Sequence, residues 1–213
     1  VTAARLAFDK GAWGRATVAE RQKALLAIHD AILAHAEELA FLETINTGIP
    51  LSQTRHVHIP RAAYNFRFFA EYINQAGGEV FTQEAGLMSI VTYEPIGVCA
   101  LIGPWNMPLG LTAMKIAGAL AFGNTCVVKP SELTPLTVTR LFEIMEGILP
   151  EGVMNLVNGR GHVTGTALVS HPGIDMVSFT GGTVTGAAIL GSLAKGIKGS
   201  AMELGGKSAN IIF

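Results

Sequence analysis

The sequence has little charge and no cluster of basic residues. Asp, Glu, Lys and Arg make up 15% of the 213 residues, and the formal net charge is −1. An average soluble domain has about 25% charged residues. A nucleic-acid-binding protein needs a basic patch or stripe, so we expect no nucleic-acid partner. The hydrophobic fraction of 49% is enough for a sizeable core.

Cysteine is scarce as well. Cys99 and Cys126 are the only two, and each lies inside an apolar run. Two such positions support neither a disulfide framework nor a zinc site, which favours a reducing compartment and a cytoplasmic location. His56 and His58 have no Cys or carboxylate beside them, so we expect a solvated turn there and no metal site.

One uncharged stretch, residues 95–114, is about as long as a membrane-spanning helix. Pro95, Pro104 and Pro108 fall inside it and would break a helix repeatedly, so we expect no membrane contact. No secretory signal is visible. The chain begins with Val1 and ends in an apolar run, and we therefore expect a piece of a longer protein.

The first 78 residues carry helical patterns. Thr17 and Glu20 form a capping box, which predicts the start of a helix. Apolar residues then recur at helical spacing from Leu25 to Leu42, and predict one long helix or two consecutive helices ending near Gly48. Another helix, rich in aromatic residues, is predicted for residues 60–73.

After residue 78 the pattern changes to strands that alternate with helices. The strands are continuous apolar runs, which predicts an α/β fold with a Rossmann-like parallel sheet and helices on both faces. The predicted strands are 79–83, 87–95, 97–104, 124–130, 152–157, 174–181 and 208–213. The predicted helices are 108–123, 134–148, 162–171 and 183–194.

Polar or glycine-rich residues follow four consecutive predicted strands, at 104–108, 129–132, 158–161 and 180–183. In an open parallel sheet, ligands bind beyond the carboxyl ends of the strands. The fingerprint G-x-G-x-x-G is absent, but Gly181–Gly186 follows a strand and opens a helix. Its free N–H groups and the helix dipole favour a pyrophosphate; the alternative is a purely structural turn.

Three polar side chains in these stretches are candidates for chemistry. Lys129 and Glu132 can hydrogen-bond the two hydroxyls of a ribose, and a Glu there favours NAD over NADP; the alternative is a surface ion pair. Asn106 can stabilise an oxyanion, or simply form a turn.

Glu203 lies between Met202 and Leu204, followed by two glycines. Apolar surroundings favour the neutral form of a carboxyl group, which suits a general base. The glycines would let a ligand approach closely. The alternative is a Glu that caps a helix or forms an ion pair.

Taken in order, five stretches resemble the aldehyde dehydrogenase superfamily. They are "EPIGVCALIGPWNMPL", "GALAFGNTCVVKPSELTPL", "GVMNLVNG", "VSFTGGTVTG" and "MELGGKSANIIF". The last one matches the glutamate active-site signature of that family, and the likeness covers essentially the whole chain. The resemblance is nearest to members that act on aromatic-pathway semialdehydes and small aliphatic aldehydes.

The resemblance implies roles for individual residues. Glu203 would be the general base, Asn106 the oxyanion-hole amide and Lys115 a supporting lysine, while Lys129 and Glu132 would bind the ribose. The other implied contacts to the cofactor, NAD rather than NADP, are Ile102, Trp105, Ser131, Gly161, Gly165, Phe179, Gly181, Gly182, Thr185 and Leu204.

The resemblance also implies an organisation of the chain. Residues 1–78 would be the helical part of the cofactor domain, 79–95 a short β oligomerisation arm and 96–213 the Rossmann-like dinucleotide-binding part. A homodimer or homotetramer is therefore expected. The catalytic, Cys-bearing domain of the family would be absent from this chain.

Two departures from the family pattern matter. Gly182 stands where many members have a Ser that contacts the pyrophosphate, although the backbone N–H remains. The catalytic Cys of the family lies a few tens of residues beyond the Glu203 signature, and Cys99 and Cys126 match other positions. We therefore expect an NAD-dependent aldehyde dehydrogenase fragment without the thiol that forms the thiohemiacetal and thioester with the aldehyde. A non-catalytic dinucleotide-binding module and a truncated structural fragment are the alternatives.

Overall fold

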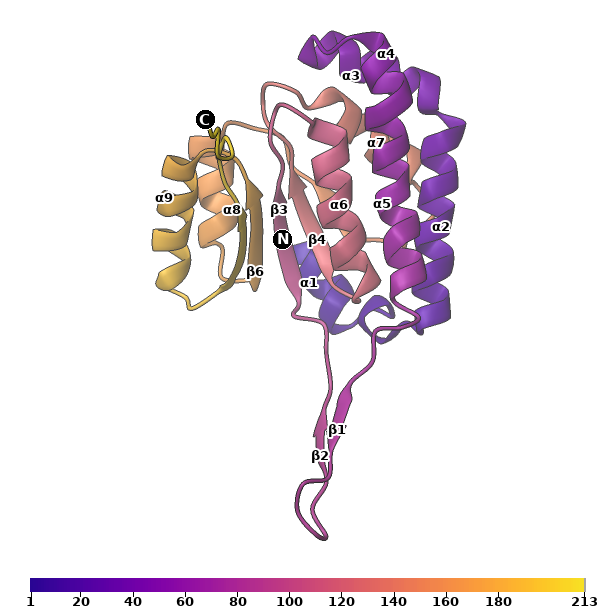
Figure 1. The fold of residues 1–213 in the computed structure, drawn as a ribbon, viewed down its shortest axis with the longest axis vertical. Helices are drawn as coiled ribbons and strands as arrows, with labels where there is room; N and C mark the ends of the chain where they lie inside the picture. Colours follow the sequence, from indigo (N-terminus) through magenta and orange to yellow (C-terminus); the bar gives the residue numbers. More distant parts are fainter. Residues whose placement is uncertain (213) are drawn as a thin grey trace.

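A five-stranded parallel sheet forms the centre of the molecule in the computed structural model, which describes residues 1–212 (Figure 1). The strand order is β5-β4-β3-β6-β7, so the chain moves outward from β3 in one direction and then returns to its other side. The strands are β3 (Val98–Ile102), β4 (Thr125–Lys129), β5 (Met154–Leu156), β6 (Met176–Thr180) and β7 (Gly199–Glu203).

Helices cover both faces of this sheet, and the predicted α/β class is confirmed. One face packs against α6, with α5 and α2 outside it, and the other packs against α1, α8 and α9. The helices are α1 (Thr2–Asp9), α2 (Val18–Ala34), α3 (Ala36–Thr47), α4 (Leu51–Gln53), α5 (Ile59–Tyr72), α6 (Pro108–Ala121), α7 (Leu136–Ile144), α8 (Thr166–Ser170) and α9 (Thr183–Ala194). Shorter turns are η1 (Trp13–Arg15), η2 (Thr54–His58) and η3 (Gly161–Gly165).

The two central strands, β3 and β4, are largely apolar because both faces of the sheet are covered there. Every residue of β3 and β4 is buried. Alternate side chains point to opposite faces, so Leu101 packs on the α6 side while Ala100 and Ile102 pack on the α8–α9 side. A strand covered on both faces needs apolar residues at every position.

The predicted N-terminal helices are also confirmed. The Thr17 side chain accepts from the Glu20 N–H at 3.2 Å, and the Glu20 carboxylate accepts from the Thr17 N–H at 2.7 Å, as a capping box requires. Two consecutive helices follow, and the second ends at Gly48, whose φ of 79° lies in the left-handed region. Glycine adopts that conformation without steric cost.

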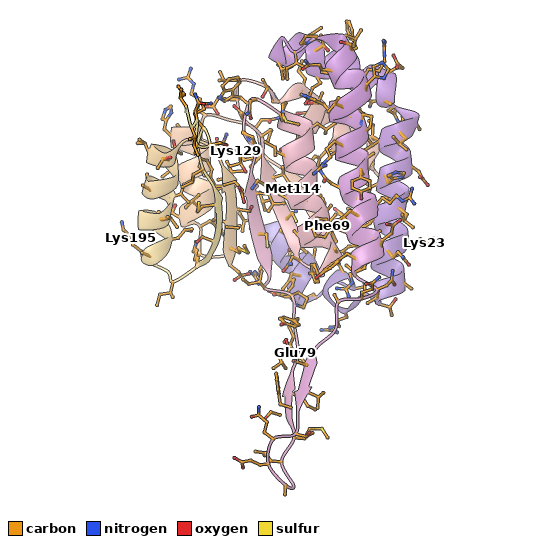
Figure 2. All side chains as sticks on the ribbon, in the orientation of Figure 1. Lys23, Phe69, Glu79, Met114, Lys129 and Lys195 are labelled. Atoms are coloured by element: carbon orange, nitrogen blue, oxygen red, sulfur yellow. The ribbon has the colours of Figure 1, made fainter. Side chains whose placement is uncertain are left out.

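A thin hairpin of β1 (Glu79–Phe81) and β2 (Ser89–Val91) projects from the lower end of the molecule in Figure 1. Figure 2 places Glu79 where the hairpin begins, far from Lys129 at the upper end of the sheet. All residues of both strands are exposed, including the cross-strand pair Val80 and Ile90. An antiparallel hairpin with no layer packed on it is marginally stable by itself.

The predicted last strand is wrong. The edge strand of the sheet is β7 at 199–203, and residues 204–212 form neither a helix nor a strand; position 213 lies outside the described residues. Ile211 and Ile212 are 70% and 87% exposed. The side chains of this edge strand are exposed or half-buried, so it lacks the apolar run that marks a buried strand.

The prediction of a solvated turn at His56 and His58 is confirmed for His56 and wrong for His58. Both lie in the helical turn η2, where His56 is exposed and His58 is only 7% exposed. Residues 95–114 form β3, a loop and the first half of α6. In the described part of the chain, no helix is long and apolar enough to cross a membrane.

Glu43 is a fully buried carboxylate that joins α3 to two other helices. One oxygen accepts from the Leu109 N–H in the first turn of α6, at 3.4 Å, and the other accepts from the Thr137 hydroxyl of α7, at 2.5 Å. The Nδ1 atom of His58 lies 3.8 Å from Glu43. Since α6 has no side-chain cap of its own, Glu43 supplies one from another helix.

We expect Glu43→Gln to gain stability relative to the parent chain as pH rises above about 4.5. Burial raises the pKa of the Glu43 carboxyl above its ordinary value of 4.5. A raised folded-state pKa contributes stability below the unfolded pKa, and that contribution is lost as pH rises through the folded one. Glutamine does not titrate. Urea unfolding between pH 4.5 and 8 measures the difference, with exposed Glu146→Gln as control; parallel curves for parent and variant would contradict the expectation.

Candidate functional site

The carboxyl ends of the strands open into a cleft of about 1020 Å³. The chain leaves β3 toward β4 on one side, and β6 returns to pair with β3 on the other. The loops that follow β3 and β6 therefore diverge and leave a crevice between them, which is where open α/β sheets bind ligands. The hairpin lies at the opposite end of the molecule (Figure 1).

All of the predicted site residues except Lys115 line this cleft. They come from the last residues of the strands, from the segments that follow β3, β4, β6 and β7, and from η3 and the first turn of α9. The residues brought together are Ile102, Trp105, Asn106, Lys129, Ser131, Glu132, Gly161, Gly165, Phe179, Gly181, Gly182, Thr185, Glu203 and Leu204.

Lys129 and Glu132 form one wall of the cleft. The Lys129 ammonium is buried, donates to the Pro130 carbonyl at 3.1 Å, and lies 3.4 Å from one Glu132 oxygen. The other Glu132 oxygen accepts from the Gly161 N–H at 2.9 Å. That bond, with the neighbouring Lys129, holds the pKa of the Glu132 carboxyl below its usual range. Both the cation and the anion reach the cleft.

The first turn of α9 forms the opposite wall. This helix of 12 residues begins after Gly182, and no side chain caps it. A Cβ at Gly181 would collide with the Phe179 ring, and one at Gly186 would lie 2.5 Å from the end of the Leu204 side chain, so a larger residue at either position requires that neighbour to move. A Cβ at Gly182 would meet nothing within 4 Å. Unpaired N–H groups at a long helix start attract anions.

The loop between β3 and α6 carries Asn106 to the mouth of the cleft. Its Oδ1 accepts from the Met107 N–H at 3.0 Å, which leaves the amide NH₂ able to donate. The buried Thr134 hydroxyl donates to the Trp105 carbonyl at 3.1 Å and fastens the loop. The buried Asn65 amide donates to the Gly110 carbonyl at 3.0 Å and fixes the start of α6.

Glu203 ends β7 and is exposed to the cleft. Its carbonyl accepts from the Gly181 N–H at 3.1 Å, so the backbone around it is held by the α9 turn. Met202 packs with the core on the α8–α9 side, and alternation along the strand puts Glu203 on the other face. The sequence had led us to expect that the apolar neighbours of Glu203 enclose its carboxylate. They do not, because Met202 points to the other face of the strand and Glu203 is exposed.

Lys115 approaches from the middle of α6 and does not line the cleft. It is 8% exposed, and its ammonium donates to the Ser178 hydroxyl of β6 at 2.8 Å. Burial lowers the pKa of Lys115 to about 8, against an opposing upward influence from the Glu203 charge. The site thus places a buried lysine with a lowered pKa within the field of Glu203.

Neither cysteine belongs to the cleft. Cys99 and Cys126 are register partners on β3 and β4, and both are buried and free. Burial raises the pKa of the Cys99 thiol to about 12 and that of Cys126 well above its usual value. Reaction requires the thiolate, so neither is a nucleophile. Across residues 1–212, no cluster of three metal-ligating side chains occurs.

Sequence reasoning missed the slot between η3–α8 and α9. Its lining includes His162, Thr166, Val169, Ala188, Ile189 and Ser192. These residues lie on helical segments and not directly after strands, so the search for polar residues at strand ends could not find them. The signal available in the sequence was helical spacing: Thr185, Ala188, Ile189 and Ser192 stand at i, i+3, i+4 and i+7, which is one side of α9.

The arrangement can bind an elongated, partly anionic molecule. An acidic–basic pair can hydrogen-bond adjacent hydroxyls, a helix N-terminus can hold a phosphate, and a mixed apolar slot can take a flat ring. At the mouth, an amide donor and an exposed carboxylate provide groups for carbonyl polarisation and proton transfer.

Curated relatives match the whole chain but only part of their own length. The 5-carboxymethyl-2-hydroxymuconate semialdehyde dehydrogenase of Escherichia coli is 44% identical over 214 residues, which covers 100% of this chain and 45% of that protein. The NADP/NAD-dependent aldehyde dehydrogenase PuuC of E. coli K12 is also 44% identical, over 100% of this chain and 43% of that protein. The chain spans a little under half the length of these relatives.

Solved structures of aldehyde dehydrogenases have the same fold as this chain. An aldehyde dehydrogenase from Bacillus cereus, solved as an NAD⁺ complex, superimposes with a TM-score of 0.96 at 39% identity, covering 100% of this chain and 43% of that one. The sequence profile described as "Aldehyde dehydrogenase family" matches residues 1–213. Profile, sequence relatives and fold therefore agree, and this chain belongs to the aldehyde dehydrogenase family.

Proposed function

We propose that this chain binds NAD and forms the cofactor-binding part of an enzyme that oxidises an aldehyde to a carboxylic acid. The observation that supports the proposal most directly is the meeting of two features in one cleft. Lys129 and Glu132 form its acidic–basic wall, and the uncapped start of α9 after Gly182 forms the other. A dinucleotide carries both of the groups that these walls suit, a ribose and a pyrophosphate.

Lys129 and Glu132 would hold the adenosine ribose. An ammonium and a carboxylate 3.4 Å apart can donate to and accept from two adjacent hydroxyls. A carboxylate at this place repels a 2′-phosphate, which supports NAD over NADP. The Gly161 N–H fixes the Glu132 side chain for this task. The name of PuuC includes both cofactors, and both are therefore compared in the experiment below.

The pyrophosphate would lie at the start of α9, where the N–H groups after Gly182 have no helical partner. The remaining proposed contacts line the same cleft with backbone or side-chain atoms. These are Ile102, Trp105, Ser131, Gly161, Gly165, Phe179, Gly181, Thr185 and Leu204.

Asn106, Glu203 and Lys115 would serve the reacting aldehyde. NAD, when bound, supplies the acceptor for the hydride that leaves the aldehyde carbon. The Asn106 amide would donate to the developing oxyanion. Glu203, exposed at the cleft, would take a proton first from a thiol nucleophile and later from the hydrolytic water. Lys115 would place a cation near Glu203.

The nucleophile is proposed to lie outside residues 1–213. Cys99 and Cys126 are buried in the sheet, and the relatives are about twice as long as this chain. The chain alone is then inactive in aldehyde oxidation. Two of these longer relatives are named for hydroxymuconic semialdehyde substrates. Their names support a semialdehyde as the substrate of the whole protein.

A non-catalytic dinucleotide-binding module is the second candidate function, and the burial of both thiols is the observation that favours it. NAD binding does not separate the two functions, whereas NADH formation from an aldehyde by the protein encoded by the whole gene does.

We propose that the protein lies in the cytoplasm. Its two free thiols are register partners on neighbouring strands, and free thiols fit a reducing compartment.

NAD is expected to raise the melting temperature of the chain by about 5–10 °C at a concentration one hundred times its Kd, because a ligand of the native state stabilises it. Glu132→Gln should weaken NAD binding about tenfold or more, since a charge-assisted hydrogen bond is lost. The same variant should reduce the preference for NAD over NADP. Isothermal titration with NAD and NADP measures both, with Glu146→Gln as control. No heat with either cofactor would reject the proposed function.

Gly182→Ser should leave NAD binding intact and raise the melting temperature by about 1 °C. The Cβ has free space, and the φ of −68° and ψ of 144° at Gly182 suit a serine N-cap. Ser exceeds Gly at an N-cap by a few tenths of a kcal/mol. Gly186→Ser is the matched control: its Cβ requires the Leu204 side chain to move, so it should not raise the melting temperature. Equal destabilisation by both variants would contradict this account of the turn.

The projecting hairpin is proposed to join copies of the chain into a homodimer or homotetramer. Its strands expose apolar side chains and unpaired backbone groups on both edges. The paired change Val80→Lys with Ile90→Lys should reduce the mass in light scattering to that of one chain, 22.4 kDa. NAD binding should persist, since the cleft lies at the other end. A parent chain that is already monomeric at about 10 μM would overturn the proposal.

A further inference from the structure

The Lys115 ammonium has one hydrogen-bond acceptor within residues 1–212, the hydroxyl of Ser178 at 2.8 Å. Lys115 is 8% exposed, so water cannot replace a lost acceptor freely. A buried ammonium is costly unless it is paired or hydrogen-bonded. The contact therefore fixes where the amine lies and stabilises its protonated form.

The register of the sheet relates this contact to Glu203. Ser178 pairs with Ala201 and Thr180 pairs with Glu203 across β6 and β7. Residues two apart on a strand point to the same face, so Ser178, Thr180 and Glu203 share the face that Lys115 reaches from α6. Ser178 lies on the strand next to that of Glu203, two residues before Thr180, the register partner of Glu203.

We propose that Ser178 is a positioning residue of this site: its hydroxyl holds the Lys115 amine on the face that carries Glu203, and thereby controls how much positive charge stands near Glu203 at neutral pH. The inference rests on the proposed role of Glu203 as general base. It extends that role by naming the group that tunes the field around the base.

The charges that act on Lys115 are few. The elements packed against α6 are α2, α5, α7, β3 and β4, and in the described part of the chain Glu203 of β7 is the charged group whose field shifts the pKa of Lys115. Burial opposes it and brings that pKa to about 8. A hydroxyl that accepts from the ammonium favours the charged form, so Ser178 and Glu203 act in the same direction.

Titration of the chain labelled with ¹³C-lysine tests the proposal by NMR, with the Lys115 signal assigned through Lys115→Met. The parent midpoint should lie near 8. Ser178→Ala should lower it by about one pH unit, since one hydrogen bond to a charged group is lost. Ser178→Thr keeps a hydroxyl and should restore the midpoint. Thr180→Val is the matched control: it removes a buried hydroxyl that has no partner among the described residues and should leave the midpoint unchanged.

A second readout connects the amine to the base. In the chain labelled with ¹³C at glutamate and serine as well, the Glu203 carboxyl carbon should show a small inflection at the Lys115 midpoint. This inflection should move with Ser178→Ala and vanish with Lys115→Met. The Ser178 Cβ signal of the parent chain should show the same inflection, which requires no variant at Ser178. A Lys115 midpoint that is identical in parent and Ser178→Ala, or a Ser178 signal that does not respond, would overturn the proposal.

NAD titration of the same samples separates this inference from the proposed function. The lysine and carboxyl titrations are measured without NAD, so they stay readable if NAD fails to bind. Failure to bind NAD rejects the proposed function alone. A normal NAD affinity with an unchanged Lys115 midpoint in Ser178→Ala rejects the role of Ser178 alone.

Discussion

Parallel pairing of β3 with β4 on one side and β6 on the other is the constraint on which the rest of the structure depends. Parallel strands require crossover helices, and those helices cover both faces of the sheet. The two crossover directions from β3 also align the carboxyl ends of the strands and separate the loops that follow them. The fold of the sheet and the existence of the cleft are thus one consequence of the same backbone hydrogen bonds.

Buried polar side chains then fix loops that the sheet alone would leave loose. Glu43 and Asn65 hold the first turn of α6 from α3 and α5, and Thr134 holds the loop before it. Lys129, 2% exposed, directs its charge to the wall of the cleft. A buried polar group is stable only when its hydrogen bonds are made, so each of these side chains determines the position of the backbone that it contacts.

The sequence predicted those features whose cause is local. Continuous apolar runs predicted β3 and β4, and a capping box at Thr17 predicted the start of α2. Residues directly after strands identified the walls of the cleft. It did not predict features that depend on neighbours distant in the chain. The edge strand β7 is largely exposed and has no apolar run, and His58 is buried in a turn that packs against α3, 3.8 Å from Glu43. Likewise, the partner of Lys115 is 63 residues away.

The glycines of the α9 turn differ in what they require. All have negative φ, so none is needed for a left-handed backbone. Gly181 and Gly186 are constrained by the Phe179 ring and the Leu204 side chain, while nothing occupies the space beside Gly182. A pattern that looks like a rule for phosphate binding is therefore largely a rule for packing. A side chain at 181 or 186 requires a neighbouring side chain to move, whereas one at 182 does not, so the three glycines of the turn are not equivalent.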